Sequence, residues 1–98
     1  MPITRLVKMT FQNEAISIFL QLFDSKKKLI RDFPGCIHLE LWQDLQNPSI
    51  CFTYSRWETI EALELYRNSS FFEDTWNATK QLFAEKPEAW SVNVVHSS

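Results

Sequence analysis

The spacing of apolar residues changes character several times along this chain of 98 residues, and the order of those changes leaves few possible folds. Strands repeat every two residues and helices every 3.6 or so. Strands are expected at residues 3–9, 36–44, 50–57 and 89–95, and helices at 12–32, 58–66 and 72–83. The last two helices are separated by Asn68-Ser69-Ser70, which interrupts the pattern. The predicted order is therefore strand, helix, strand, strand, broken helix, strand.

This order predicts an α+β fold of the ferredoxin-like βαββαβ type. Right-handed crossovers then give a four-stranded antiparallel sheet with the helices on one face. Alternation in the second strand is expected to put one set of side chains on the same face: Cys36, His38, Glu40 and Trp42. The face without helices offers large apolar groups, so we expect two copies of the chain to pair their sheets as a dimeric α+β barrel.

Composition narrows the class of protein. The length leaves room for one domain, residues 1–98. Hydrophobic residues make up 45% of the chain and aromatic residues 14%, a heavy load for a small monomer that indicates either an unusually aromatic core or a subunit interface. The net charge is −2, and no basic patch indicates binding to nucleic acid. Lys26, Lys27 and Lys28 fall late in a predicted helix, where cations favour the negative end of the helix dipole.

Several common features are missing from the sequence. Cys36 and Cys51 provide neither a disulfide framework nor a metal-binding spacing. The first residues contain no apolar export segment, and no apolar run approaches the roughly 20 residues that cross a bilayer. Metal-ligand clusters and Gly-rich phosphate loops are also absent. We therefore expect a cytoplasmic protein that needs no cofactor and makes no contact with membranes.

Short motifs throughout the chain resemble the antibiotic biosynthesis monooxygenase family. That family has a Pro-Gly-Cys before the second strand, a Trp-Glu that closes the third, and then a helix with Ala-Leu. The matching segments are Phe33-Pro34-Gly35-Cys36, Asn47-Pro48, residues 52–63 with Trp57-Glu58 and Ala62-Leu63, and Tyr66-Arg67-Asn68-Ser69-Ser70-Phe71-Phe72. The resemblance covers essentially the whole chain, and the Trp-Glu segment is its most specific part. It implies a dimeric ferredoxin-like fold, in agreement with the element order.

The resemblance also bears on chemistry. Members of the family oxidise polycyclic phenols and quinols without metal or flavin, relatives degrade haem, and many members have no known activity. Many relatives have a His where this chain has Tyr66, and in the haem degraders that His binds iron. Those enzymes also have an Asn on the first strand, where this chain has Val7. Only Trp57 remains of that trio, so haem breakdown is disfavoured.

Three residues are candidates for catalysis in a cleft between sheet and helices. Trp57 could stack on a flat ring, or it could be a core indole with a satisfied N–H. Tyr66 could donate a hydrogen bond to a substrate oxygen, or it could pack as an ordinary core tyrosine. His38 is the only internal histidine and the natural general base, although its face belongs either to the cleft or to the dimer barrel.

Three further residues are candidates for substrate contact. Thr53 shares a sheet face with Trp57, where it could orient a ligand or merely pack. Phe72 and Trp76 could line the cleft from the helices or fill the core. Elsewhere, Arg5 and Arg56 are expected to form interface ion pairs with Glu40 in preference to substrate contacts.

The sequence therefore predicts a cofactor-free monooxygenase that oxidises a small aromatic substrate of the phenol or quinol type. Such chemistry needs an apolar cleft that binds the ring, excludes water and stabilises an anion. The alternative is a non-enzymatic small-molecule-binding or stress-response module of the same dimeric barrel fold. A purely structural dimer would lack a cavity, so the size and polarity of the cleft are the decisive observation.

Overall fold

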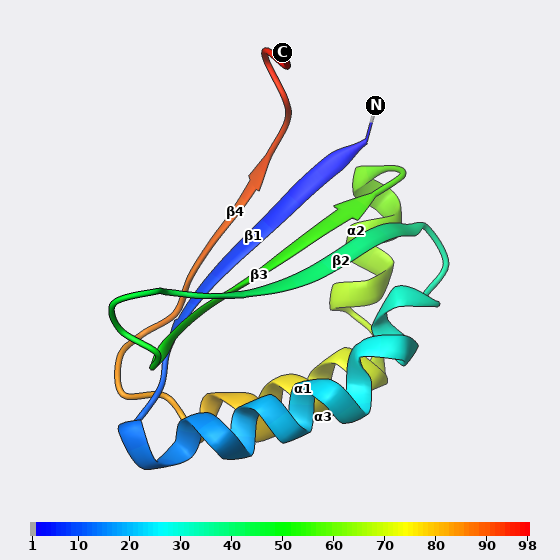
Figure 1. The fold of residues 1–98 in the computed structure, drawn as a ribbon. Coiled ribbons are helices and arrows are strands. Elements are labelled where there is room, and N and C mark those ends of the chain that lie inside the picture. Colours follow the sequence, from blue (N-terminus) through cyan, green and yellow to red (C-terminus); the bar gives the residue numbers. More distant parts are fainter. Residues whose placement is uncertain (1) are drawn as a thin grey trace.

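The computed structural model describes residues 2–98, which form one sheet with all helices on one of its faces (Figure 1). The strands are β1 (Ile3–Thr10), β2 (Cys36–Gln43), β3 (Ile50–Trp57) and β4 (Glu88–Val92). The helices are the short 3₁₀ helix η1 (Asn13–Ala15) and the α-helices α1 (Ile16–Arg31), α2 (Ile60–Arg67) and α3 (Ser70–Lys80). All pairings are antiparallel, in the order β2-β3-β1-β4. The predicted ferredoxin-like α+β fold is confirmed.

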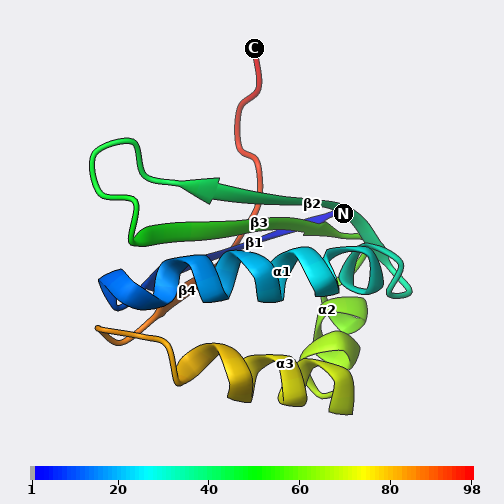
Figure 2. The same ribbon diagram turned by 60° about the horizontal axis from the view of Figure 1, so that its bottom comes forward.

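Side-chain caps explain where α2 and α3 begin. The Thr59 hydroxyl accepts a hydrogen bond from the Ala62 amide at 3.1 Å, so α2 starts two residues later than the spacing predicted. The Ser69 hydroxyl accepts from the Phe72 amide at 3.1 Å, so α3 starts two residues earlier. The Ser69 cap lies where the chain turns from α2 into α3, a turn that Figure 2 shows.

The strand register assigns side chains to two faces. On the helix side, Val7 of β1 lies opposite Thr53 of β3. On the outer face, Leu6 lies opposite Tyr54 on one side and Trp90 on the other. The outer face has no helix over it (Figures 1 and 2). It carries large aromatic side chains, among them Trp42, Tyr54 and Trp90.

The expected position of Cys36 on the His38 face is wrong. The register of β2 shifts between these two residues, because the β2–β3 pairing is irregular there. An irregularity of this kind changes which way the strand's side chains point. Cys36 is buried on the helix side against Trp57 and Leu63, whereas His38 is exposed.

The last strand is shorter than expected. β4 ends at Val92, which lies opposite Thr4 near the start of β1. Beyond that point β1 has almost no residues left to pair, so the chain loses its hydrogen-bonding partner. Residues 93–98 leave the sheet as an exposed extension (red in Figure 1) rather than continuing the strand to residue 95.

The core between sheet and helices consists of two buried clusters. One centres on Met9, Phe11 and Phe19, near the start of α1. The other centres on Trp57 and Leu63, near α2. Both clusters contribute walls to a single cavity, so packing is incomplete between them. None of the helices formed by residues 2–98 is long and apolar enough to span a membrane.

Candidate functional site

A cavity of about 310 Å³ lies between the helix-side face of the sheet and the three α-helices. This is the lower end of the size range of sites for small molecules, about 300–1,000 Å³. Most of its lining is apolar and comes from every strand and α-helix, for example Val7, Phe23, Leu39, Leu63, Trp76 and Ala89. The cavity therefore suits a small ligand that is mainly apolar.

One wall of the cavity is a run of aromatic rings in mutual contact. Tyr66 stacks on Trp57, with ring centroids 4.9 Å apart and an interplanar angle of 27°. Phe72 meets Tyr66 edge-on at 5.1 Å and stacks against Trp76 at 6.0 Å. All four rings line the cavity. The predicted candidates Trp57, Tyr66, Phe72 and Trp76 thus lie together, and they offer flat surfaces on which an aromatic ligand can pack.

Trp57 is the rear layer of this wall rather than its surface. Its side chain is 0% exposed, and its Nε1–H donates a hydrogen bond to the Ser55 hydroxyl at 3.0 Å. Tyr66 stacks over it and is only partly buried. Trp57 therefore has the features of a core indole, and it holds the Tyr66 ring in place.

Tyr66 is suited to donate a hydrogen bond and unsuited to act as a base. Burial, and to a lesser degree the neighbouring Cys36, raises the pKa of the Tyr66 hydroxyl well above its usual value. At neutral pH the group is therefore protonated. It can donate to an oxygen of a bound molecule, and a negative charge on that oxygen strengthens the bond.

Three threonines line the cavity, and the hydroxyl of one of them, Thr79, donates to the Thr75 carbonyl at 2.7 Å. Thr53 of β3 lies on the helix side and lines the cavity, on the face predicted from its strand alternation. Thr75 of α3 also lines it, and its buried Oγ1 has no hydrogen-bond partner within residues 2–98. The sequence analysis missed Thr75. Its position three residues after Phe72 and one before Trp76, on the same helix face, is the signal that would have found it.

Cationic side chains reach the cavity as well. Arg5 of β1, Lys26 of α1 and Arg67 of α2 all line it. The expected ion pair of Arg5 with Glu40 is wrong, because Arg5 points to the helix side and Glu40 to the outer face. Sequence analysis could have found Arg5 as the one charged residue in the otherwise apolar series Ile3, Val7 and Met9.

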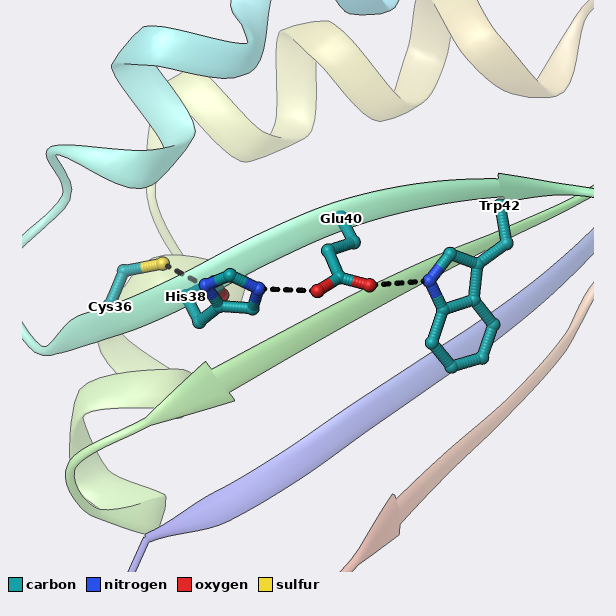
Figure 3. A network of polar contacts seen from close by, with 4 residues as sticks. All are labelled: Cys36, His38, Glu40 and Trp42. Carbon is teal, nitrogen blue, oxygen red and sulfur yellow. Dashed lines mark hydrogen bonds and ion pairs between the residues drawn. The ribbon is translucent and has the colours of Figure 1, made fainter.

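His38 does not line the cavity. It lies on the outer face of the sheet, in a chain of polar contacts along β2 (Figure 3). Its Nε2 is 2.6 Å from one oxygen of Glu40, and the Trp42 Nε1–H donates to the other oxygen at 2.7 Å. These two hydrogen bonds, that from Trp42 first, hold the pKa of Glu40 below its usual value. To transfer a proton inside the cavity, the His38 side chain would have to reach through the sheet.

The cavity has few groups with acid–base or metal chemistry. None of the side chains that line it is a histidine or a carboxylate within residues 2–98. Over the same residues, no group of three or more His, Cys, Asp or Glu side chains is arranged to hold a metal ion. The site therefore offers an apolar enclosure, aromatic surfaces, one half-buried phenol, hydroxyl groups and cations.

The fold and the cavity together define a class: a ferredoxin-like α+β protein with an aromatic-walled cavity between sheet and helices. The family model described as Antibiotic biosynthesis monooxygenase matches residues 2–78, and the chain belongs to this family. The resemblance seen in the sequence motifs is thereby confirmed. A comparison with curated proteins found no match.

Solved structures agree with the fold. A structure described as an antibiotic biosynthesis monooxygenase superposes with a TM-score of 0.89 at 18% identity, covering 96% of this chain and 99% of the other. A conserved protein from Methanosarcina mazei Go1 gives 0.88 at 21% identity, over 93% and 90%. A protein from Mycobacterium tuberculosis gives 0.89 at 15% identity, over 100% and 99%. At these identities the similarity shows the fold alone.

Proposed function

We propose that this chain is a cofactor-free monooxygenase that oxidises a small phenol or quinol in the cavity between sheet and helices. The observation that carries the proposal is the aromatic-walled cavity of about 310 Å³ in a chain of this family. In this proposal, residues 1–98 form a single domain that carries the activity. The cytoplasmic location and the lack of a cofactor remain predictions from the sequence.

The reaction balances without an added reductant. A bound phenolate passes one electron to O₂, and the resulting phenoxyl radical and superoxide combine at a ring carbon that bears hydrogen, ortho or para to the oxygen. Proton uptake and loss of water from that peroxide leave a carbonyl. Phenol and O₂ thus give a quinone and water, and each product receives one of the two atoms of O₂. The protein has to bind the phenolate, exclude water and stabilise charge.

The residues of the cavity match those tasks. Tyr66 donates a hydrogen bond to the substrate oxygen, and Trp57 is a positioning residue that supports the Tyr66 ring. Phe72 and Trp76 pack against the substrate ring, and Thr53 orients it from the sheet. Because no histidine or carboxylate among residues 2–98 lines the cavity, the phenolate forms by loss of a proton to solvent, favoured by nearby cations.

The same lack of a base favours a second candidate function. A protein that only binds an aromatic molecule, as a sensor or a stress-response module, needs the enclosure and the polar contacts but no proton acceptor. Both candidates use the same cavity. Oxygen consumption separates them, because a binding module takes up ligand without consuming O₂.

The unpartnered outer face of the sheet supports a homodimer. Trp42 stacks on Tyr54 at 5.0 Å with an interplanar angle of 16°, which makes a broad flat aromatic surface. Trp90 lies on the same face, and both tryptophans are more than 40% exposed. Exposed groups of this size on one face indicate an interaction surface. A second copy that presents the same face would bury them in an isologous interface, as the resemblance implies.

Oxygen uptake with a panel of hydroquinones and naphthols tests the proposed reaction. Tyr66→Phe removes only a hydroxyl, and loss of a hydrogen bond to an anion costs about 1.5–3 kcal/mol. We expect kcat/KM to fall by about ten- to a hundred-fold. Trp57→Phe should lower it as well, because the support of the Tyr66 ring changes.

The matched control is Tyr54→Phe, the same change at the only other tyrosine, on the opposite face of the sheet. It should leave kcat/KM unchanged. Equal activity of wild type and Tyr66→Phe would contradict the role given to the hydroxyl. Absence of oxygen uptake with every phenol, despite binding in the cavity, would favour the binding module.

A further inference from the structure

Arg5 is a cation in an unusual place, since it projects from the first half of β1 into the space between sheet and helices. Its guanidinium donates a hydrogen bond from Nη1 to the Ser91 hydroxyl of β4 at 3.0 Å. Within residues 2–98 no carboxylate lies within 4.0 Å of it. Arg5 is half-buried, so its charge is only partly removed from water, and an anion beside it would offset that partial cost.

A second arginine increases this cost. Arg67, at the end of α2, lines the same cavity, and its charge acts on Arg5 as a like charge. Burial first, and then Arg67, lowers the pKa of Arg5. Glu64 opposes the effect and pairs with Arg67 at 3.4 Å, but that pair is exposed and serves Arg67 rather than Arg5. The cavity thus carries an excess of positive charge.

We propose that Arg5 and Arg67 form an anion-binding pole, so that the ligand of the cavity is an aromatic acid: a ring system that bears a carboxylate or phenolate oxygen. The inference rests on the proposed function only in placing an aromatic ligand in this cavity. The guanidinium groups present planar donors that suit two oxygen atoms. The aromatic wall that begins at Tyr66 takes the ring, and the pole takes the charge.

The size of the cavity limits the ring system. A cavity of about 150 Å³ is enough to bind benzene. The space here, about 310 Å³, is roughly twice that volume. A fused two-ring system such as a naphthalene, with its acidic group, fits this volume, whereas a flat system of four rings does not. The buried Thr75 hydroxyl, which has no partner within residues 2–98, offers a contact for a second polar substituent.

The other possible role for Arg5 is to tie β4 to β1 through Ser91. That role would make Arg5 important for stability but indifferent to the charge of a ligand. The comparison of a charged ligand with its neutral analogue separates the two roles, because both analogues bind the same folded protein.

Calorimetric titration under nitrogen, where no turnover occurs, makes this comparison with naphthoate and its methyl ester. We expect naphthoate to bind about ten- to a hundred-fold more tightly, the range for hydrogen bonds to charged groups. Arg5→Gln should abolish the preference, and Arg5→Lys should keep part of it because the charge remains. Lys80→Gln, which removes a cation from the exposed end of α3, is the control and should retain it.

Naphthol, titrated below and above its own pKa, separates the two anions. Tighter binding of naphtholate alone would mean that Arg5 and Arg67 bind the phenolate oxygen that takes part in the reaction. Tighter binding of naphthoate would mean that the two arginines bind an acidic substituent separate from the reacting oxygen. Preference for either anion over its neutral form supports the pole.

Glu64→Gln should change the affinity for naphthoate in the direction opposite to Arg5→Gln. It removes the carboxylate that competes for Arg67, so naphthoate should bind about two- to five-fold more tightly. Equal affinity of both anions and their neutral forms in wild type, for naphthoate and its ester and for naphtholate and naphthol, would overturn the proposal. Selective binding of the acids without oxygen uptake by any of them would leave the pole standing and contradict the monooxygenase alone.

Discussion

At the scale of single residues, the two threonines of α3 show how the cavity affects stability. The Thr75 hydroxyl is buried and has no partner within residues 2–98, whereas the Thr79 hydroxyl donates to the Thr75 carbonyl at 2.7 Å. The two residues lie one helical turn apart on the same face of α3. Thr79 is buried and Thr75 half-buried, and the main difference between them is whether the hydroxyl is satisfied.

Replacement by valine should therefore act in opposite directions. Thr75→Val removes an unsatisfied buried group and should raise the free energy of unfolding of the ligand-free protein by about 0.5–2 kcal/mol. Thr79→Val removes a made hydrogen bond and should lower it by about 1 kcal/mol. Urea denaturation measures both values. Destabilisation by Thr75→Val equal to that by Thr79→Val would mean that the Thr75 hydroxyl has a partner in solution.

Residue scale is also where sequence reasoning reached its limit. Trp57, Tyr66, Phe72 and Trp76 could be grouped from spacing, because strand and helix periodicity each point aromatic groups to the core. Arg5 could have been placed there from the apolar alternation of β1, but its contact with Ser91 could not, because the two residues lie 86 positions apart in the chain. Whether Trp57 presents its ring or hides it depends on the stacking of Tyr66, which no spacing encodes.

At the scale of elements, the turn from α1 into β2 depends on one glycine. Gly35 has φ of +89°, a conformation that side chains rarely adopt. Its carbonyl accepts a hydrogen bond from the Glu58 amide at 2.8 Å, next to the start of α2. A Cβ at this position would overlap the Ala62 side chain. The only glycine of the chain is thus required by both conformation and close approach.

Gly35→Ala should lower the free energy of unfolding by about 2–4 kcal/mol, the sum of backbone strain and overlap. Ala62→Gly alone should cost about 1 kcal/mol through helix propensity. In the double variant the overlap is relieved, so the total cost should be smaller than the sum of the single changes. Strict additivity in urea denaturation would show that Ala62 is not the obstacle.

The order of the elements has local causes in the sequence, whereas some of their boundaries have tertiary causes. The order of strands and helices followed from periodicity, and all predicted elements are present. The irregularity at Cys36 and His38 and the early end of β4 did not follow, because each depends on the partner strand. Pairing between segments far apart in the chain decides such details.

At the scale of the whole molecule, the outer sheet face should hold two copies together. Sedimentation equilibrium of the wild type should give a mass near twice 11.6 kDa. Trp42→Glu places a charge on the aromatic surface of this face and should shift the protein to monomer, because an unpaired charge in an interface is costly. The control is Leu65→Glu on α2, where the replaced side chain is more exposed, at 70% against 41%.

Leu65→Glu should remain dimeric. A wild type that stays monomeric at micromolar concentration would contradict the pairing of outer faces. Dissociation by Leu65→Glu but not by Trp42→Glu would move the interface to the helices.

In the proposed complex, the cavity between sheet and helices holds an aromatic acid with its ring on the Tyr66 wall and its charge at Arg5 and Arg67. A crystal structure with bromonaphthoate tests it directly, because anomalous scattering locates the bromine and the electron density locates the carboxylate. We expect the bromine inside the cavity and the carboxylate within hydrogen-bond distance of the Arg5 guanidinium. A ligand bound on the outer face beside Trp42, or one that points its carboxylate away from both arginines, would contradict the account.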